Sequence, residues 1–421
     1  MQLDKIHLKN YRAHTDLTVE FNPHFNVLVG VNGSGKTSLL HGICASFYGL
    51  LLNKVPTEIA SDSDVRHCVE ITEGRYRFEL QYPLEIVATG KAFDKFHEWK
   101  LSKTSELTRT DISGNLPSIQ EAVKDTSITV PLVVFYPANR KWSFTNDANK
   151  IQSVIHKESR KDAYTKYWNA SENINDLQSW VIAKCLERWQ TSSETGELFD
   201  NISGDELGLV NQALHHALED IKGLRYDMKQ KSLLVEWQTG VEAMTIEHLS
   251  DGQRAIICLV VDIARRMCIL NPQLGQEVTE KTPGIVLIDE LDMHLHPEWQ
   301  RRITRSLKTA FPAVQFIVAS HSPQVIGELR PEEIILLTTE GMAHPQTSYG
   351  LDSSKVLEEI MGASPRTESV QKDLDSLSKA IAYNKLGEAK KYLNKLQKET
   401  FDLPELLGAQ ALIQRKEVLG K

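Results

Sequence analysis

Apolar residues near the N-terminus follow the spacing of β-strands. Between residues 2 and 29 they predict three short strands, the last of them the β-rich 25–29. Residues 65–102 repeat an alternation of apolar and polar positions, which predicts a strand-rich meander. The apolar run 131–136 predicts a further, buried strand that Pro137 ends.

The spacing changes from strand to helix after residue 139. Residues 139–223 carry polar and helical patterns, and a predicted hairpin follows at 224–239. The elements predicted beyond it are a helix at 251–270, a strand at 284–289, a helix at 298–310, and strands at 314–319 and near 334–337. A Pro- and Gly-punctuated loop joins the first helix to the first strand. Strands that alternate with helices at this spacing predict a parallel α/β sheet.

The chain from residue 353 onward is polar and helical, without internal repeats. Its apolar positions form an amphipathic stripe made of Leu374, Leu377, Ile381, Leu386, Ala389, Tyr392 and Leu393. Two hypotheses stay open for the tail 367–421. It is a docking or oligomer surface, or it packs back on the head of its own chain.

The charge balance limits how this chain could meet nucleic acid. The net charge of −8 over 421 residues excludes a global basic field, so any such contact must rest on a local patch. Residues 139–166 contain seven Lys or Arg and three Asp or Glu, which gives a local +4. This stretch is either a solvated helical face with a flexible loop, or a surface for a phosphate backbone or a partner.

The five cysteines are scattered, and no Cys-x-x-Cys spacing occurs. An odd count without a framework indicates reduced thiols inside the cell. No window approaches about 18 consecutive apolar residues, and the first residues lack the apolar run of a signal peptide. We therefore expect a soluble cytoplasmic protein of two to three structural units, without a membrane partner.

Residues 30–37 read Gly-Val-Asn-Gly-Ser-Gly-Lys-Thr and match the phosphate-binding loop Gly-x-x-x-x-Gly-Lys-Ser/Thr. A predicted strand precedes the loop and a helical pattern follows it, so backbone N–H groups and the helix N-terminus would converge on phosphate oxygens. We expect Lys36 to reach the β- and γ-phosphates of ATP and Thr37 to ligate Mg²⁺. The residues assigned to the nucleotide here are Gly30, Asn32, Gly33, Ser34, Gly35, Lys36, Thr37 and Ser38.

Two carboxylates close the apolar run 284–288. This pattern is typical of a central strand that ends at the carboxyl edge of an open α/β sheet, where ligands bind. We expect Asp289 to hold Mg²⁺, usually through a water molecule, and Glu290 to polarise the attacking water. A core strand with a polar end would look similar, but metal-assisted phosphoryl transfer needs this pair together with the phosphate loop.

The sequence Leu-Ser-Asp-Gly-Gln-Arg at 249–254 precedes an apolar helix, and Ser250 suits an N-cap. The order of phosphate loop, Leu-Ser-x-Gly-Gln and Asp-Glu strand resembles the ATP-binding-cassette (ABC) ATPases, in their RecF/SMC-like branch. The resemblance implies an α/β fold. That fold is an ABC-ATPase head with a mixed β-lobe and a parallel P-loop core, extended by a helical insertion and a helical C-terminal tail.

The resemblance also implies roles for single residues. Ser250, Gly252 and Gln253 would belong to the signature, which binds the γ-phosphate of ATP held by the other subunit. ATP would then join two heads into a dimer or a larger homo-oligomer. His321, within Ala-Ser-His-Ser-Pro, resembles the switch histidine that senses the γ-phosphate. Arg12, within Leu-Lys-Asn-Tyr-Arg, is a candidate phosphate contact.

Other positions carry weaker signals. Leu291-Asp292 resembles the D-loop of the family, and Gln81 is a weak candidate for its Q-loop glutamine. His294 and His296 could suggest a metal site. They fit more simply as part of the Glu-Leu-Asp-x-His-Leu-His-Pro run that this branch often has.

The layout argues against three kinds of relative, because we find the defining feature of none of them in this sequence. Transporters need membrane spans, SMC and Rad50 proteins need long heptad arms, and nucleases of the overcoming-lysogenization type need a Toprim domain. A compact head with a short insertion resembles the PtuA family of Septu anti-phage systems, also found beside some retrons. That resemblance implies a self-assembling ATPase that controls DNA cleavage by a separate HNH nuclease of the PtuB type, with no nuclease site in this chain.

Two function classes stay open at this point. The first is the defence ATPase, and the second is a RecF-like repair ATPase that binds DNA directly as an ATP-gated dimer. A third idea is a sensor that turns ATP over slowly. We divide the chain into an N-terminal lobe (1–138), a helical insertion (139–223), a C-terminal lobe with the remaining motifs (224–345) and a helical tail (346–421).

Overall fold

The computed structural model describes residues 1–51, 61–72, 75–115, 119–140, 142, 159–238, 240, 242–338, 341–364, 366–400 and 403–419. The chain divides into two compact units, Met1–Leu351 and Asp352–Lys421. Much of the predicted basic stretch lies outside the described residues, namely Lys141, Asp147, Lys150, Lys157 and Glu158. The finer division of the head into two lobes and an insertion stays a prediction.

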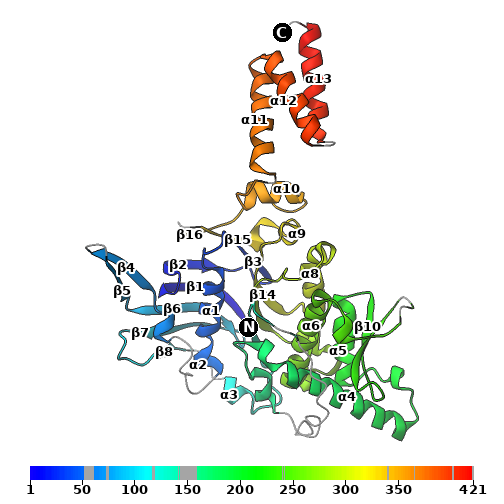
Figure 1. Cartoon of the computed structure of the whole chain (residues 1–421). Coiled ribbons are helices and arrows are strands. Elements are labelled where there is room, and N and C mark those ends of the chain that lie inside the picture. The colour runs from blue at the N-terminus through cyan, green and yellow to red at the C-terminus, as the bar shows by residue number, and fades with distance from the viewer. Residues whose placement is uncertain are drawn as a thin grey trace. The chain divides into compact units, whose positions relative to one another are not determined.

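An antiparallel sheet opens the first unit (Figure 1). Its strands, in spatial order, are β2 (His14–Glu20), β1 (Gln2–Tyr11), β6 (Leu84–Ala92), β7 (Lys95–Lys103) and β8 (Asp111–Gly114). A separate pair joins β4 (His67–Thr72) to β5 (Arg75–Leu80). Buried positions alternate along β6, as expected for a sheet with one face against the core. The strand pattern predicted for the N-terminal region is confirmed.

A second sheet carries the core. Its strands, in spatial order, are β16 (Gly341–Ala343), β15 (Ile334–Thr338), β3 (Phe25–Val29), β14 (Val314–Ala319), β13 (Gly284–Ile288) and β9 (Leu132–Tyr136). The five strands from β15 to β9 run parallel, and only β16 is antiparallel. Every residue of β3, β9, β13 and β14 is buried, as parallel strands covered on both faces require. The predicted parallel α/β core is confirmed.

The helix α1 (Lys36–Ser46) lies between the two sheets, because it contacts β1 and β6 as well as β13 and β14. In Figure 1, α5 (Glu206–Ala217), α6 (Asp251–Leu270) and α8 (Pro297–Ala310) lie together on one side of the first unit. The bounds of α6 match the sequence prediction. Shorter helices are α2 (Tyr48–Leu51), α3 (Ile119–Ala122) and α9 (Pro323–Ile326). No helix among the described residues combines the length and apolar character needed to cross a membrane.

The structure corrects two predicted connections. The stretch before β13, predicted as a loop, contains a 3₁₀ turn at Pro272–Glu277 and the helix α7 (Val278–Lys281). The predicted hairpin begins earlier than expected, because β10 spans Ile221–Asp227 and pairs with β11 (Ser232–Trp237). The short β12 (Met244–Thr245) completes that sheet. Lys222 is exposed and polar and Gly223 is rare in strands, and together they had hidden the start of β10.

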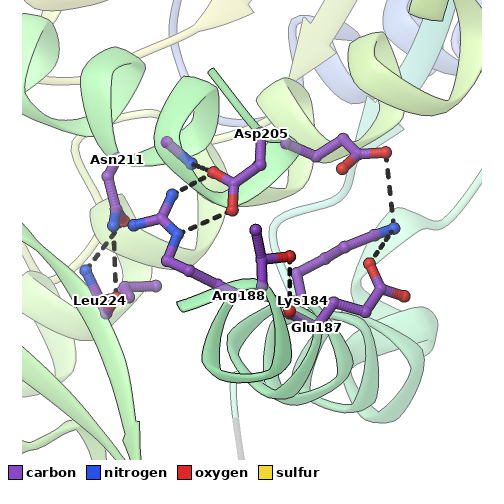
Figure 2. Close-up of polar contacts among 9 residues, drawn as sticks. Lys184, Glu187, Arg188, Asp205, Asn211 and Leu224 are labelled. Carbon is purple, nitrogen blue, oxygen red and sulfur yellow. Dashed lines mark hydrogen bonds and ion pairs between the residues drawn. The ribbon is translucent and has the colours of Figure 1, made fainter. Parts of the chain in front are cut away.

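Polar contacts that Figure 2 shows tie the long helix α4 (Ile174–Thr195) to the start of α5, and α5 to β10. Arg188 of α4 donates to both carboxylate oxygens of Asp205 from Nε and NH2, with Nε 2.7 Å from Oδ2. Asp205 also caps α5 by accepting from the N–H of Gly208 at 2.8 Å. Asn211 holds the backbone of Leu224 through one accepted and one donated bond. These bonds fix α5 to the helix before it and to the strand after it.

The second unit is a small helical bundle with its own core. It contains the short helix α10 (Ser353–Lys355), a π-type turn (Val356–Ile360), α11 (Glu368–Ala382), α12 (Leu386–Glu399) and α13 (Pro404–Leu419). The last three helices contact one another. Buried members of the predicted stripe, such as Leu377 and Ala389, pack in this core with Leu406 and Ile413 of α13. The amphipathic stripe is therefore covered within the unit itself.

Candidate functional site

The phosphate-binding loop joins β3 to α1 at the carboxyl end of that strand, as the sequence predicted. Gly33 and Gly35 adopt left-handed backbone angles, with φ of 85° and 91°. A Cβ on Gly35 would lie 2.4 Å from His14 Cε1, and one on Gly30 would lie 2.6 Å from Ser34 Oγ. Glycine is needed at residue 35 for both conformation and space, and at residue 30 for space.

The loop and the start of α1 carry polar groups suited to a bound anion. Among the described residues, no side chain caps the N-terminus of α1. Ser34 Oγ is buried and has no hydrogen-bond partner in the same part of the chain. Lys36 is 7% exposed, and its Nζ donates to the carbonyl oxygens of Gly30 (2.8 Å) and Val31 (3.2 Å). Burial lowers the pKa of Lys36, and the nearby carboxylates of Asp289 and Glu290 oppose that shift. These features fit the oxygens of a phosphate chain.

Thr37 and Asp289 come together across more than 250 residues of chain. Thr37 Oγ1 donates to Asp289 Oδ2 at 2.8 Å, and Asp289 is 2% exposed. Two neighbouring oxygen ligands of an octahedral Mg²⁺, each about 2.0–2.1 Å from the ion, lie about 2.9 Å apart, so this pair fits two such positions. The described residues hold no group of three or more His, Cys, Asp and Glu that could bind a metal ion.

Glu290 directly follows Asp289 beyond the end of β13. Its φ is +47°, a left-handed conformation that costs a non-glycine residue on the order of 1–3 kcal/mol. Arg140 donates to the backbone here, with NH1 2.5 Å from Asp289 O and NH2 2.8 Å from Glu290 O. Burial lowers the pKa of Arg140, while the carboxylates of Asp289, Glu290 and Asp292 oppose the shift. The structure thus stores backbone strain beside the phosphate loop.

Asp292 links the Asp-Glu strand to the predicted switch histidine. Its Oδ1 accepts from Ser320 Oγ at 2.6 Å and from the backbone N–H of His321 at 3.2 Å. The N–H of Leu291 donates to Ala319 O at 2.9 Å, which joins the same two segments. The parallel pairing of β13 with β14 brings these strand ends to one edge. His321 therefore lies where the sequence argument expected it, at the carboxyl edge of the sheet.

The signature stretch starts α6. Ser250 is the N-cap, accepts from the N–H of Gln253 at 3.3 Å and forms a capping box with that residue. A Cβ on Gly252 would lie 2.2 Å from His294 O, so glycine is required where the helix meets this backbone. Among the described residues, the side chain of Ser250 bonds only to Gln253. Its exposed hydroxyl is free of the phosphate loop of its own chain.

Other predicted residues have local partners instead. Arg12 has φ of +47°, and its Nε donates to Asp64 Oδ1 at 2.7 Å, so here it pairs with a carboxylate. Gln81 follows β5, and its N–H donates to Arg66 O. His296 caps α8, which is a structural use that agrees with the simpler sequence interpretation. The assignments of Arg12 and Gln81 to nucleotide stay predictions.

Sequence reasoning did not single out two supporting residues. His14 places its Nε2 3.0 Å from Gly35 O and braces the phosphate loop. Arg140 was counted only as one charge in a basic stretch, yet it is 8% exposed and contacts the Asp-Glu backbone. The available signal was that Arg140 follows a buried strand closely, as Asp289 does. The sequence does not reveal that β9 and β13 are neighbours.

Comparison with known proteins agrees with this geometry. A family model described as "AAA domain" matches residues 5–222, about half of the chain. The chain belongs to this family. A second model, described as "AAA domain, putative AbiEii toxin, Type IV TA system", matches residues 199–327. The two matches overlap and together contain the phosphate loop, the signature and the Asp-Glu strand.

Three curated relatives show which branch the chain resembles. It is 24% identical to "Retron Vc95 probable ATPase" of Vibrio cholerae serotype O1 biovar El Tor, over 80% of this chain and 73% of that protein. It is 23% identical to "Septu protein PtuA" of Bacillus thuringiensis, over 82% and 80%. It is 28% identical to "DNA replication and repair protein RecF" of Clostridium botulinum, over 42% and 48%. The chain is thus an ABC-type ATPase similar to PtuA and the retron ATPases.

Proposed function

We propose that this chain binds and hydrolyses ATP with Mg²⁺. The observation that carries the proposal is the meeting of Thr37 Oγ1 and Asp289 Oδ2 at 2.8 Å beside an uncapped, glycine-rich helix N-terminus. The backbone N–H groups of the loop and the ammonium of Lys36 would bind the phosphates. Bound Mg²⁺ would neutralise charge on the β- and γ-phosphates.

Glu290 is the proposed general base for hydrolysis. It would orient and polarise the water that attacks the γ-phosphorus, and His321 would sense that phosphate from the end of β14. The sheet supports this assignment, because β13 and β14 are neighbours and end at one edge. Lys36 and Asp289 are buried, and electrostatic contacts that they make with the substrate would be stronger than in water.

We further propose that ATP joins two heads. Ser250 presents an exposed hydroxyl at the N-terminus of a 20-residue helix, where backbone N–H groups favour an anion. Its side chain makes no bond to the phosphate loop of its own chain. The γ-phosphate of ATP that is bound to a second subunit would contact this helix start.

The association test uses Ser250→Arg, with Ser250→Gly as the control for loss of the N-cap. A long cation at the helix start should block ATP-dependent assembly while ATP affinity of the isolated chain stays within about threefold. Glycine is a tolerated N-cap, so its helix should stay intact. Light scattering with and without ATP measures the assembly. Normal ATP-dependent oligomers from Ser250→Arg would refute the shared site.

At the level of the cell, we propose a subunit of an anti-phage defence complex that regulates a partner HNH nuclease of the PtuB type, which cleaves DNA. Support comes from relatives named as a Septu protein and a retron ATPase, each matched over about four fifths of the chain. The chain itself would supply the ATP-dependent assembly. The cleavage site would belong to the partner.

The alternative is a RecF-like repair ATPase that binds DNA directly as an ATP-gated dimer. The match to a RecF protein favours it, although only 42% of the chain is covered. Pull-down of the tagged protein from its native host, with and without ATP, separates the two. A large assembly that holds a small HNH nuclease supports the defence role. A lone dimer that gains salt-dependent affinity for DNA when ATP is added supports the repair role.

A further inference from the structure

Arg140 reaches the proposed catalytic strand from a neighbouring strand. β9 pairs in parallel with β13, and Tyr136 stands opposite Ile288 at the carboxyl end of both. The N–H of Asp289 donates to Tyr136 O at 2.9 Å, which extends this pairing by one residue. The chain then turns, with the N–H of Arg140 donating to Pro137 O at 3.3 Å. This turn directs the side chain of Arg140 back onto the end of β13.

The guanidinium joins two consecutive carbonyl groups. NH1 donates to Asp289 O and NH2 donates to Glu290 O, at 2.5 and 2.8 Å. A planar fork with parallel N–H groups fixes both acceptors at once, which an ammonium does less well. The side chain is buried, so the contact is not an incidental surface contact. The orientations of the two peptide groups that flank Glu290 are thereby set from outside their own strand.

The backbone at Glu290 needs such support. Glu290 holds a left-handed φ, which persists only where the surroundings over-determine it. The same carbonyl, Glu290 O, also accepts from the N–H of Met293 at 3.1 Å, so the turn after β13 is held at two places. The positive charge of Arg140 lies near the carboxylates of Asp289, Glu290 and Asp292, and it can offset part of their mutual repulsion.

We propose that Arg140 is a positioning residue for hydrolysis: its guanidinium fixes the backbone that carries Asp289 and Glu290 and so places the general base. This inference rests on the proposed ATPase function. It assigns to Arg140 no contact with substrate. Arg140 acts through Glu290, so its loss should affect turnover far more than nucleotide binding.

The test compares Arg140→Ala with Arg160→Ala. Arg160 is a matched control, because it is also 8% exposed and also donates to backbone carbonyls, those of Leu270, Asp125 and Ile128. Its partners lie outside the Asp-Glu turn. Steady-state turnover, affinity for a fluorescent ATP analogue and thermal unfolding are measured for both variants. Turnover is corrected for the folded fraction.

We expect Arg140→Ala to lower kcat about 10- to 100-fold, since small misplacements of a catalytic group have effects of that size. Affinity for the ATP analogue should change less than threefold. Arg160→Ala should keep the kcat of its folded fraction. Guanidinium ions at millimolar concentration should restore part of the activity of Arg140→Ala and leave Arg160→Ala unchanged. Arg140→Lys should fall between the wild type and Arg140→Ala.

The outcomes distinguish a failure of the Arg140 role from a failure of the proposed ATPase function. Wild-type protein that hydrolyses no ATP would overturn the proposed function. Active wild-type protein with an equally active Arg140→Ala, or with equal losses in both alanine variants, would overturn only the role of Arg140. A failure of guanidinium to rescue any activity would also count against it. If Arg140→Ala does not fold, Arg140→Lys decides by the same ratio of kcat loss to affinity loss.

Discussion

Two polar clusters in the unit Met1–Leu351 are built in opposite ways. The phosphate-side cluster comprises Lys36, Thr37, Arg140, Asp289 and Glu290, and the insertion cluster comprises Lys184, Glu187, Arg188, Asp205 and Asn211. The insertion cluster satisfies its charges locally (Figure 2). The phosphate-side cluster includes the strained Glu290 and lies beside the Ser34 hydroxyl, which has no hydrogen-bond partner among the described residues.

The difference separates structural polar groups from functional ones. A buried polar group whose hydrogen bonds are all made in the free chain needs no ligand to satisfy it, and it stabilises the fold. Buried donors without acceptors and strained backbone cost stability, and they persist where something else is to be bound. Substitutions in the two clusters should therefore have opposite consequences for activity and stability.

The largest expected effect belongs to Glu290→Gln. An amide of the same shape cannot accept a proton, so turnover should fall on the order of 1000-fold. ATP should still bind, and the protein should accumulate as an ATP-bound dimer or larger oligomer. Phosphate release and size-exclusion chromatography with ATP measure the two properties. Glu290 is not the base if this variant hydrolyses ATP at the wild-type rate.

Lys36→Ala should follow in size. Removal of a charged donor from a buried phosphate site costs about 3 kcal/mol of binding, which corresponds to about 100-fold in ATP affinity. Thermal stability should change little or rise, since burial already disfavours the ammonium in the free chain. Titration with a fluorescent ATP analogue and a thermal melt test both points. Unchanged affinity would rule out the phosphate-loop assignment.

Arg188→Ala should show the reverse behaviour. It leaves Asp205 without its main charged partner, and the free energy of unfolding should fall by about 2–3 kcal/mol, below the range for a fully buried pair because Asp205 is partly exposed. ATP affinity and the turnover of folded protein should stay at wild-type values. Lys184→Ala on the same helix is the control, with an expected loss of about 1 kcal/mol or less. A loss of turnover without loss of stability would contradict the structural role.

The smallest effect concerns His41, on the helix that carries the phosphate loop. Burial, helped by Arg12 and opposed by Asp64, lowers the pKa of His41 to about 4. The His41 ring packs edge-on against the Phe135 ring, with 5.0 Å between the ring centroids. Below the unfolded pKa of about 6.5 the unfolded chain binds a proton that the folded chain does not. Stability should therefore fall by about 2 kcal/mol between pH 7 and pH 5.

His41→Gln provides the comparison for that pH effect. The variant lacks the titrating ring, so its stability should depend less on pH over the same range. Urea unfolding at several pH values measures the difference between the two proteins. Parallel stability curves for wild type and variant would show that His41 does not titrate as proposed.

Much of the site could be predicted from short stretches of sequence. The phosphate loop, the signature and the Asp-Glu strand are local motifs, because each one needs a fixed order of residues to form its turn, cap or strand end. The glycines at residues 30 and 35 and the N-cap at Ser250 have the local uses that their residue types favour. The parallel sheet followed from the alternation of apolar runs with helical spacing.

Only the tertiary structure revealed the partners that hold these motifs. Arg140 and Asp289 lie 149 residues apart, and no local pattern in either stretch predicts their contact. The same holds for His14 with Gly35 and for Arg12 with Asp64. The start of β10 was also missed, because its first residues are polar at their exposed positions and resemble a loop.

The sequence by itself determined the chemistry of this protein: which loop can wrap a phosphate, which carboxylates end a strand, and which helix begins with a serine N-cap. These properties depend on neighbours along the chain. The tertiary structure decided which strand ends share an edge, and so which side chain supports Glu290. The physical reason is that strand order depends on the packing of whole elements around a common core, and no local pattern encodes that arrangement.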